Sequence, residues 1–137
     1  MPGPSLQVVI DCADPATLAP FWAELLGYQV QPPPPGFDSW QGFLRKQGVP
    51  EDQWNAASAI VDPDGARPRI FFQRVPESKT GKNRVHLDVN AGGPHGTPPE
   101  EHAVALGATT LYEMDRPDMG DAWVTMADPE GNEFCIQ

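Results

Sequence analysis

Alternating apolar and polar residues predict two similar strands, one near the N-terminus and one in the middle of the chain. The first spans about residues 6–12, and its apolar face consists of Val8, Ile10 and Cys12. The second spans about residues 83–89, and its apolar face consists of Val85, Leu87 and Val89. Because successive side chains of a strand point to opposite faces, each apolar face should pack against a helix. The opposite faces are polar and carry Gln7, Asp11, Arg84, His86 and Asp88.

A helical pattern follows the first strand. Asp14 can cap a helix, and Pro15 suits the first helical position, where a missing N–H is tolerated. Apolar residues then recur at helical spacing, at Leu18, Phe21, Trp22, Leu25 and Leu26. Gly27 provides a left-handed stop. Pro20 interrupts the pattern and should bend the helix or disturb its first turns.

The second strand leads into a similar series of landmarks. Pro98 and Pro99 should open a shorter helix, with Ala103 and Leu106 facing inward. Both segments then reach an Asp-Pro-X-Gly turn, at residues 62–65 and 128–131, and a final extended run at 69–75 or 133–137. The same order of elements occurs twice, which indicates an internal duplication. We therefore expect one domain over residues 1–137, with module 1 at about 5–76 and module 2 at about 82–137.

These motifs resemble the vicinal oxygen chelate superfamily, of the glyoxalase/bleomycin resistance protein/dioxygenase type. The resemblance rests on residues 10–15 leading into residues 21–28, on residues 82–89 and on residues 128–135, and it is greatest to glyoxalase-like proteins of actinobacteria. It implies an α+β fold in which two βαβββ modules form a cup-shaped, half-barrel mixed sheet around one cavity. It also implies a homodimer, since small members of this fold usually pair. The superfamily includes enzymes and antibiotic binders, so the fold alone does not define an activity.

In metal-dependent members of the superfamily, four inward residues on the first and last strands of the modules hold a divalent ion. The resemblance places at these positions Gln7, Arg84, Cys135 and one of Arg69, Phe71 and Gln73. A guanidinium cannot ligate a cation, so we expect neither a standard metal site nor a metal cofactor. The alternative is a displaced divalent site formed by His86, Glu133 and Gln7.

His86 and Glu133 are the candidate catalytic residues. The imidazole titrates near neutrality and could act as general base or acid, oriented by Glu133 or Asp88. A structural alternative is an internal ion-pair network in which Arg84 neutralises Asp88 and Asp11. We expect Cys135 to be a small buried residue more than a nucleophile.

The first module contains an insertion at about residues 37–57. Asp38 or Ser39 can cap a short helix there, with Trp40, Phe43 and Leu44 on one side. This segment could form a lid or rim that offers aromatic surface to a ligand, or it could pack against the sheet edge or a dimer partner. The full predicted set of ligand-binding residues is Gln7, Asp11, Trp40, Trp54, Arg84, His86, Asp88, Trp123, Glu133 and Cys135.

Composition narrows the possible partners. Nine Lys and Arg residues against 19 Asp and Glu give a net charge of −10, which disfavours nucleic acid and anionic membranes. No apolar run approaches the ~20 residues of a membrane span, and the N-terminus lacks the pattern of a signal peptide. Two cysteines do not make a disulfide framework. We therefore expect a cytoplasmic protein without nucleic-acid or membrane partners.

Two functions remain open from the sequence. The first is binding of a small, partly aromatic organic molecule without a metal, as in antibiotic or metabolite sequestration. The second is an enzyme, a lyase, isomerase or cyclase, in which His86 acts with Glu133 or Asp88, either metal-free or with the displaced divalent site.

Overall fold

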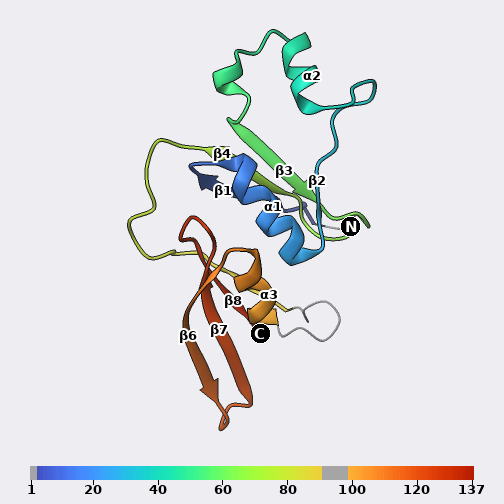
Figure 1. Ribbon diagram of the computed structural model, residues 1–137. Helices are drawn as coiled ribbons and strands as arrows, with labels where there is room; N and C mark the ends of the chain where they lie inside the picture. Colours follow the sequence, from blue (N-terminus) through green and yellow to red (C-terminus); the bar gives the residue numbers. More distant parts are fainter. Residues whose placement is uncertain (1–2, 91–98) are drawn as a thin grey trace.

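The computed structural model describes residues 3–90 and 99–137, which form two four-stranded sheets with helices beside them (Figure 1). The N-terminal sheet has the order β1-β4-β3-β2 and contains β1 (Val8–Cys12), β2 (Gln29–Val30), β3 (Ala57–Val61) and β4 (Ile70–Arg74). The C-terminal sheet has the order β5-β8-β7-β6 and contains β5 (Leu87–Val89), β6 (Thr109–Arg116), β7 (Asp121–Ala127) and β8 (Glu133–Ile136). β1 pairs with β4 in parallel, and β5 pairs with β8 in parallel, whereas the other neighbouring strands are antiparallel. The predicted α+β class and repeated strand order are therefore confirmed.

The helices are α1 (Pro15–Leu26), α2 (Trp40–Lys46) and α3 (Pro99–Leu106), and a short 3-10 helix, η1, spans Glu51–Gln53. Figure 1 shows α1 and α3 together in front of the sheets, and α2 well away from them beyond β3. Asp14 occupies the N-cap position of α1, but its side chain makes no capping hydrogen bond to the helix backbone. Its carboxylate accepts instead from Thr17 Oγ1 and Asn55 Nδ2, each at 2.7 Å. As predicted, Gly27 ends α1 in a left-handed conformation, with φ of 70°. Pro20 is exposed, and the helix continues through it.

α1 belongs to the core of both halves of the chain. Its Trp22 is fully buried, and the Trp22 ring lies 4.9 Å from the ring of Phe134 in β8, measured between centroids. The Trp22 indole Nε1 donates a hydrogen bond to Asp128 Oδ2 (3.0 Å) in the turn before β8. The Asp128 carboxylate also accepts from the backbone N–H groups of Glu130 and Asn132 and from Asn132 Nδ2, each at 2.9 Å. The helix of the first half is thus fixed to the turn of the second.

The two Asp-Pro-X-Gly turns adopt the predicted geometry. Gly65 N–H donates to Asp62 O, and Gly131 N–H donates to Asp128 O, each at 2.9 Å. The side chain of Arg67 pairs with the Asp62 carboxylate (3.1 Å). Hydrogen bonds from Arg67 and from the backbone N–H of Asp64 hold the pKa of Asp62 well below its usual range.

One strand differs from its sequence prediction. β5 begins at Leu87 and not at residue 83, and Val85, expected on the apolar face, is 82% exposed. The backbone N–H of Asn83 donates to Glu133 Oε2 (2.8 Å), so the chain at this point is bonded to a side chain and not to the backbone of β8. In the following helix, Ala103 is buried and Leu106 packs on the core as predicted, whereas Pro98 lies outside the described residues.

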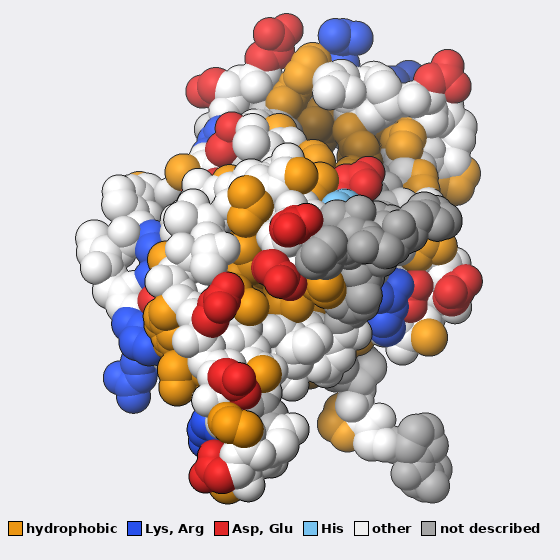
Figure 2. All heavy atoms as spheres, turned by 60° about the horizontal axis from the view of Figure 1, so that its bottom comes forward, with side chains coloured by type: hydrophobic (Ala, Val, Ile, Leu, Met, Phe, Trp, Pro, Cys, Tyr) orange, Lys and Arg blue, Asp and Glu red, His pale blue; other side chains and the backbone are white. Residues whose placement is uncertain are grey.

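The surface reflects the acidic composition. Figure 2 shows acidic side chains along the middle of one face, and basic side chains mainly at its margins. Within the described parts of the chain, every helix is too short or too polar to cross a membrane.

Candidate functional site

Each sheet carries a pocket on the face opposite its packed helices. The N-terminal pocket has a volume of about 270 Å³ and is lined by β3, β4 and the inserted segment, including Trp40, Leu44, Trp54, Arg69 and Phe71. The C-terminal pocket has a volume of about 420 Å³ and is lined mainly by β5 to β8, including His86, Asp88, Tyr112, Trp123 and Cys135. A third space of about 980 Å³, the inter-sheet groove, lies between β1 and residues 75–87. Eight of the ten predicted ligand-binding residues are therefore distributed over these three spaces, whereas Gln7 and Arg84 line none of them.

The inserted segment forms one wall of the N-terminal pocket. Ser39 caps the N-terminus of α2, and its Oγ accepts from Gly42 N–H (3.0 Å). Trp40 Nε1 donates to Gln31 O (2.7 Å), and Trp54 Nε1 donates to Val49 O (2.9 Å). Both indole N–H groups are thereby bonded to backbone, which fixes the two rings beside the pocket. The rim interpretation of this segment agrees with this arrangement.

The first-strand candidates lie away from the C-terminal pocket. Gln7 is exposed, and its Oε1 accepts from Arg69 Nη1 (2.8 Å) at the N-terminal sheet. Asp11 lines the inter-sheet groove and accepts from Gln73 Nε2 (2.7 Å). Of the three residues considered for the last inward position, Arg69 and Phe71 line the N-terminal pocket, whereas Gln73 bonds to Asp11.

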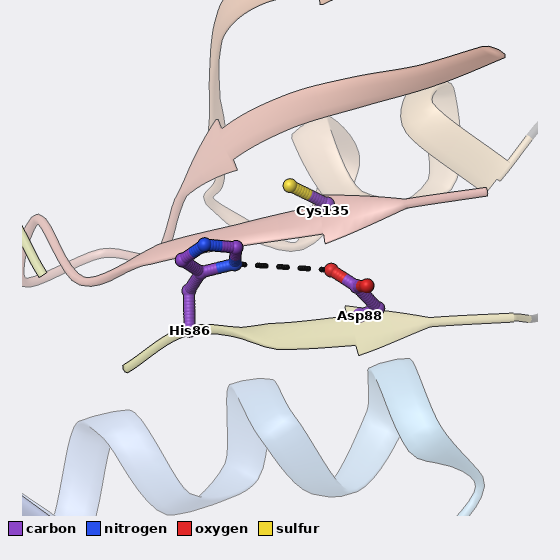
Figure 3. A group of neighbouring side chains, drawn as sticks. All are labelled: His86, Asp88 and Cys135. Atoms are coloured by element: carbon purple, nitrogen blue, oxygen red, sulfur yellow. Dashed lines mark ion pairs between the residues drawn. The ribbon is translucent and has the colours of Figure 1, made fainter. Parts of the chain in front are cut away.

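His86, Asp88 and Cys135 form a cluster in the C-terminal pocket (Figure 3). The parallel register of β5 and β8 places Asp88 opposite Cys135, and His86 lies two residues before Asp88 on the same face. The three side chains are on the side of the sheet that faces away from α1, and His86 Nδ1 lies 3.8 Å from Asp88 Oδ1. One potential ligand atom of each residue lies within 4.8 Å of the other two. Cys135 is buried beside Thr125, with 3.5 Å between Sγ and Oγ1.

The structure separates the two acids that were predicted to orient His86. Glu133 Oε2 accepts from Asn83 N–H and lies 3.9 Å from Lys82 Nζ, so this carboxylate holds the segment before β5. Asp88 is the acid beside the imidazole, and its Oδ2 accepts from Gln137 Nε2 (3.2 Å).

The predicted ion-pair network around Arg84 is wrong. Arg84 precedes β5, is exposed and lines none of the three spaces. Across residues 3–90 and 99–137, neither Asp11 nor Asp88 forms an ion pair with Arg84; Asp11 accepts from Gln73, and Asp88 accepts from Gln137 and faces His86.

Sequence reasoning missed part of the C-terminal pocket wall. Tyr112 and Arg116 of β6 line it, and the Arg116 guanidinium lies 4.9 Å from the ring centroid of Trp123, which was predicted. Residues 112, 114 and 116 share one strand face, and their period-two spacing was the available signal, although a register shift between Thr110 and Tyr112 interrupts it over the rest of β6. That pattern was not separable from an ordinary solvated strand, since all of β6 is exposed.

The comparisons with known proteins concern nearly the whole chain. A family model described as a glyoxalase-like domain matches residues 7–137. A search of curated proteins finds no match. Among solved structures, a variant of the fosfomycin resistance protein FosX from Listeria monocytogenes, complexed with Mn(II) and 1S,2S-dihydroxypropylphosphonic acid, aligns with a TM-score of 0.65 and 12% identity, covering 100% of this chain and 90% of that one.

Two further structures are similar at the same level. FosX from Mesorhizobium loti has a TM-score of 0.62 and 9% identity over 99% of this chain and 92% of that chain. A glyoxalase/bleomycin resistance protein/dioxygenase family enzyme from Burkholderia phytofirmans has a TM-score of 0.58 and 17% identity over 95% and 94%. At these identities the likeness establishes the shared fold.

Proposed function

The chain belongs to the glyoxalase-like domain family, and from this premise we propose that it binds a small, partly aromatic organic molecule in its sheet pockets. The observation that carries the proposal is the N-terminal pocket, where two tryptophan rings are fixed beside the apolar surface of β3 and β4. Small-molecule sites typically combine such apolar walls with a few oriented polar groups. The role in the cell is sequestration of an antibiotic or a metabolite, in a protein that functions as a homodimer.

An enzymatic role is the second candidate, because His86, Asp88 and Cys135 meet in the C-terminal pocket. In this role His86 exchanges a proton with the bound molecule. Asp88 faces Nδ1, so Nε2 is the nitrogen available to a ligand, and the carboxylate stabilises the imidazolium that forms. The reaction class is a lyase, isomerase or cyclase step.

A divalent metal fits this cluster better than it fits the positions named from the sequence. Gln7 bonds to Arg69 and Glu133 bonds to Asn83, whereas His86, Asp88 and Cys135 offer a nitrogen, an oxygen and a sulfur donor close together. A thiolate and an imidazole favour a zinc-like ion over Mn(II), the ion named in the FosX structure. A metal held by these three residues would supply Lewis-acid polarisation of a ligand oxygen. Binding at the N-terminal pocket does not depend on it.

The proposal is tested first by a thermal-shift screen of aromatic natural products and glyoxal-type thiol adducts. A compound that binds the folded state raises the apparent melting temperature by mass action. We expect hits whose affinity falls at least tenfold in Trp54→Leu. The proposal is rejected if no compound stabilises the protein, or if Trp54→Leu leaves every affinity unchanged.

The two candidate roles differ in the fate of the bound compound. Mass spectrometry of each hit should recover it unchanged if the protein sequesters it. If the protein is an enzyme, His86→Ala should still bind the compound but no longer convert it, and His102→Ala, on α3 and outside the pockets, should convert it normally. Elemental analysis of Cys135→Ser against Cys12→Ser then reports whether the cluster holds a metal.

A further inference from the structure

The N-terminal pocket contains a cationic side chain, which a purely apolar binding site does not need. Of the described residues that line it, Arg69 is the single charged one, and the others are aromatic, aliphatic or neutral polar residues. The C-terminal pocket differs, because Lys82, His86, Asp88, Arg116 and Glu133 line it with both signs of charge.

Neutral side chains hold the Arg69 guanidinium in place. Its Nε donates to Gln31 Oε1 (2.9 Å), and its Nη1 donates to Gln7 Oε1 (2.8 Å). The guanidinium carbon lies 5.5 Å from the ring centroid of Phe71. These contacts orient the group without neutralising it, and no carboxylate from the described parts of the chain lies within ion-pair distance.

Three of the five N–H donors of Arg69 remain available to a ligand. An arginine side chain has five N–H donors, and the two amide oxygens accept two of them. The three remaining donors, one on Nη1 and two on Nη2, lie in the guanidinium plane, where they can pair with the oxygens of a carboxylate. The rings of Trp40, Trp54 and Phe71 line the same pocket, so a group bound by the fork would extend into aromatic surroundings.

From this arrangement we propose that the N-terminal pocket selects arenecarboxylates, with the carboxylate on Arg69 and the ring system among Trp40, Trp54 and Phe71. This inference rests on the proposed small-molecule function and assigns its ligand class. The volume of about 270 Å³ lies just below the ~300–1,000 Å³ typical of ligand pockets, so it suits a small ligand of one ring or two fused rings. The net charge of −10 opposes anion binding at long range, but salt screens it beyond ~8–10 Å, and no acid lines this pocket among the described residues.

The experiment compares 2-naphthoate and benzoate with their neutral amides, 2-naphthamide and benzamide, by isothermal titration calorimetry. We expect each carboxylate to bind at least tenfold more tightly than its amide. Arg69→Gln should abolish this preference, and Arg69→Lys should retain part of it. The matched control is Arg74→Gln, which removes an exposed cation from the same strand outside the pocket and should keep the preference within about twofold.

The four tryptophans locate the bound probe. Trp22 is in the core, Trp123 lines the C-terminal pocket, and Trp40 and Trp54 line the N-terminal pocket. In a ¹H–¹⁵N spectrum of the labelled protein, naphthoate should shift the indole N–H signals of Trp40 and Trp54 and leave the other two in place. Assignment uses single Trp→Phe variants, and dispersed signals in Arg69→Gln show that this variant is folded.

Equal affinity for acid and amide in the wild-type protein overturns the inference, and this comparison requires no variant. A shift confined to Trp123 also overturns it, while leaving the proposed small-molecule function intact. Absence of binding by both carboxylates overturns it as well. If the broader thermal-shift screen still gives hits, the failure belongs to the arenecarboxylate assignment alone, and if that screen is empty the proposed function fails too.

Discussion

The carboxylate of Asp128 joins α1 to the turn before β8 inside the core. It accepts four hydrogen bonds in a residue that is 3% exposed: Oδ1 accepts two backbone N–H groups, and Oδ2 accepts Trp22 Nε1 and Asn132 Nδ2. Asp128→Asn keeps the shape but replaces one acceptor oxygen with an NH₂ donor. Whichever way the amide turns, one pair of donors then faces another donor.

The expected loss follows from these contacts. A hydrogen bond to a charged group contributes about 1.5–3 kcal/mol, so losing one pair should lower the free energy of unfolding by about 3–6 kcal/mol. A domain of this size is typically stable by ~5–15 kcal/mol, so the variant should lose a large fraction of its stability. Urea denaturation followed by circular dichroism at pH 7 measures the loss by linear extrapolation.

Two controls make this prediction specific. Asp64→Asn changes an exposed acid in the equivalent turn and should shift stability by no more than ~0.5 kcal/mol. In a Trp22→Phe background, Asp128→Asn should cost less than in the wild type, because one of the competing donors is gone. A loss below about 1 kcal/mol in Asp128→Asn, or strict additivity with Trp22→Phe, would refute the role of the carboxylate as the junction between α1 and the second turn.

Two further predictions concern ionisation. The pKa of Asp62 is depressed in the folded state by Arg67, so its contribution to stability is present above the unfolded pKa of about 3.9 and is lost as pH falls through the lower folded value. Urea denaturation should therefore show Asp62→Asn less stable than wild type at pH 7, with the gap shrinking below about pH 4; an unchanged gap at pH 3, or an equal gap for Asp64→Asn, contradicts this. Burial raises the pKa of the Cys12 thiol to about 11, so its thiolate fraction at pH 8 is only about 10⁻³. Both thiols are buried at the edge of a pocket, so the small thiolate fraction of Cys12 should place its reaction with iodoacetamide after that of Cys135 in time-resolved mass spectrometry; preferential labelling of Cys12 is the opposing result.

Local sequence patterns predicted the elements whose start, spacing and end are set by residues close together in the chain. The helical spacing from Leu18 to Leu26, the stop at Gly27 and the two proline turns all depend on residues close in the chain, and the structure confirms them. The strand before Leu87 was overestimated, because alternation does not reveal that a distant carboxylate, Glu133, takes up the N–H of Asn83.

The grouping of the site residues was harder to predict, because it depends on pairing between distant strands. Cys135 was identified as a pocket residue, but its position beside Asp88 and His86 follows from the parallel register of β5 and β8. The sequence alone did not predict which residues of β5 and β8 lie opposite each other. Arg69 was one of three alternatives for a single position, and only the fold shows which neutral groups surround it.

The short helix α2 has a consequence for how the N-terminal pocket behaves over time. It has seven residues, and none of its side chains is fully buried. A helix of this length does not persist in water without contacts outside itself, so the hydrogen bond from Trp40 to Gln31 O and the contact between the rings of Phe43 and Phe37 maintain it. Its amide protons should therefore exchange with solvent through local opening, well before those of α1. A molecule seated against Trp40 would slow exchange in α2 and leave α1 unchanged, so occupancy of the pocket can be followed without any change in the sheets.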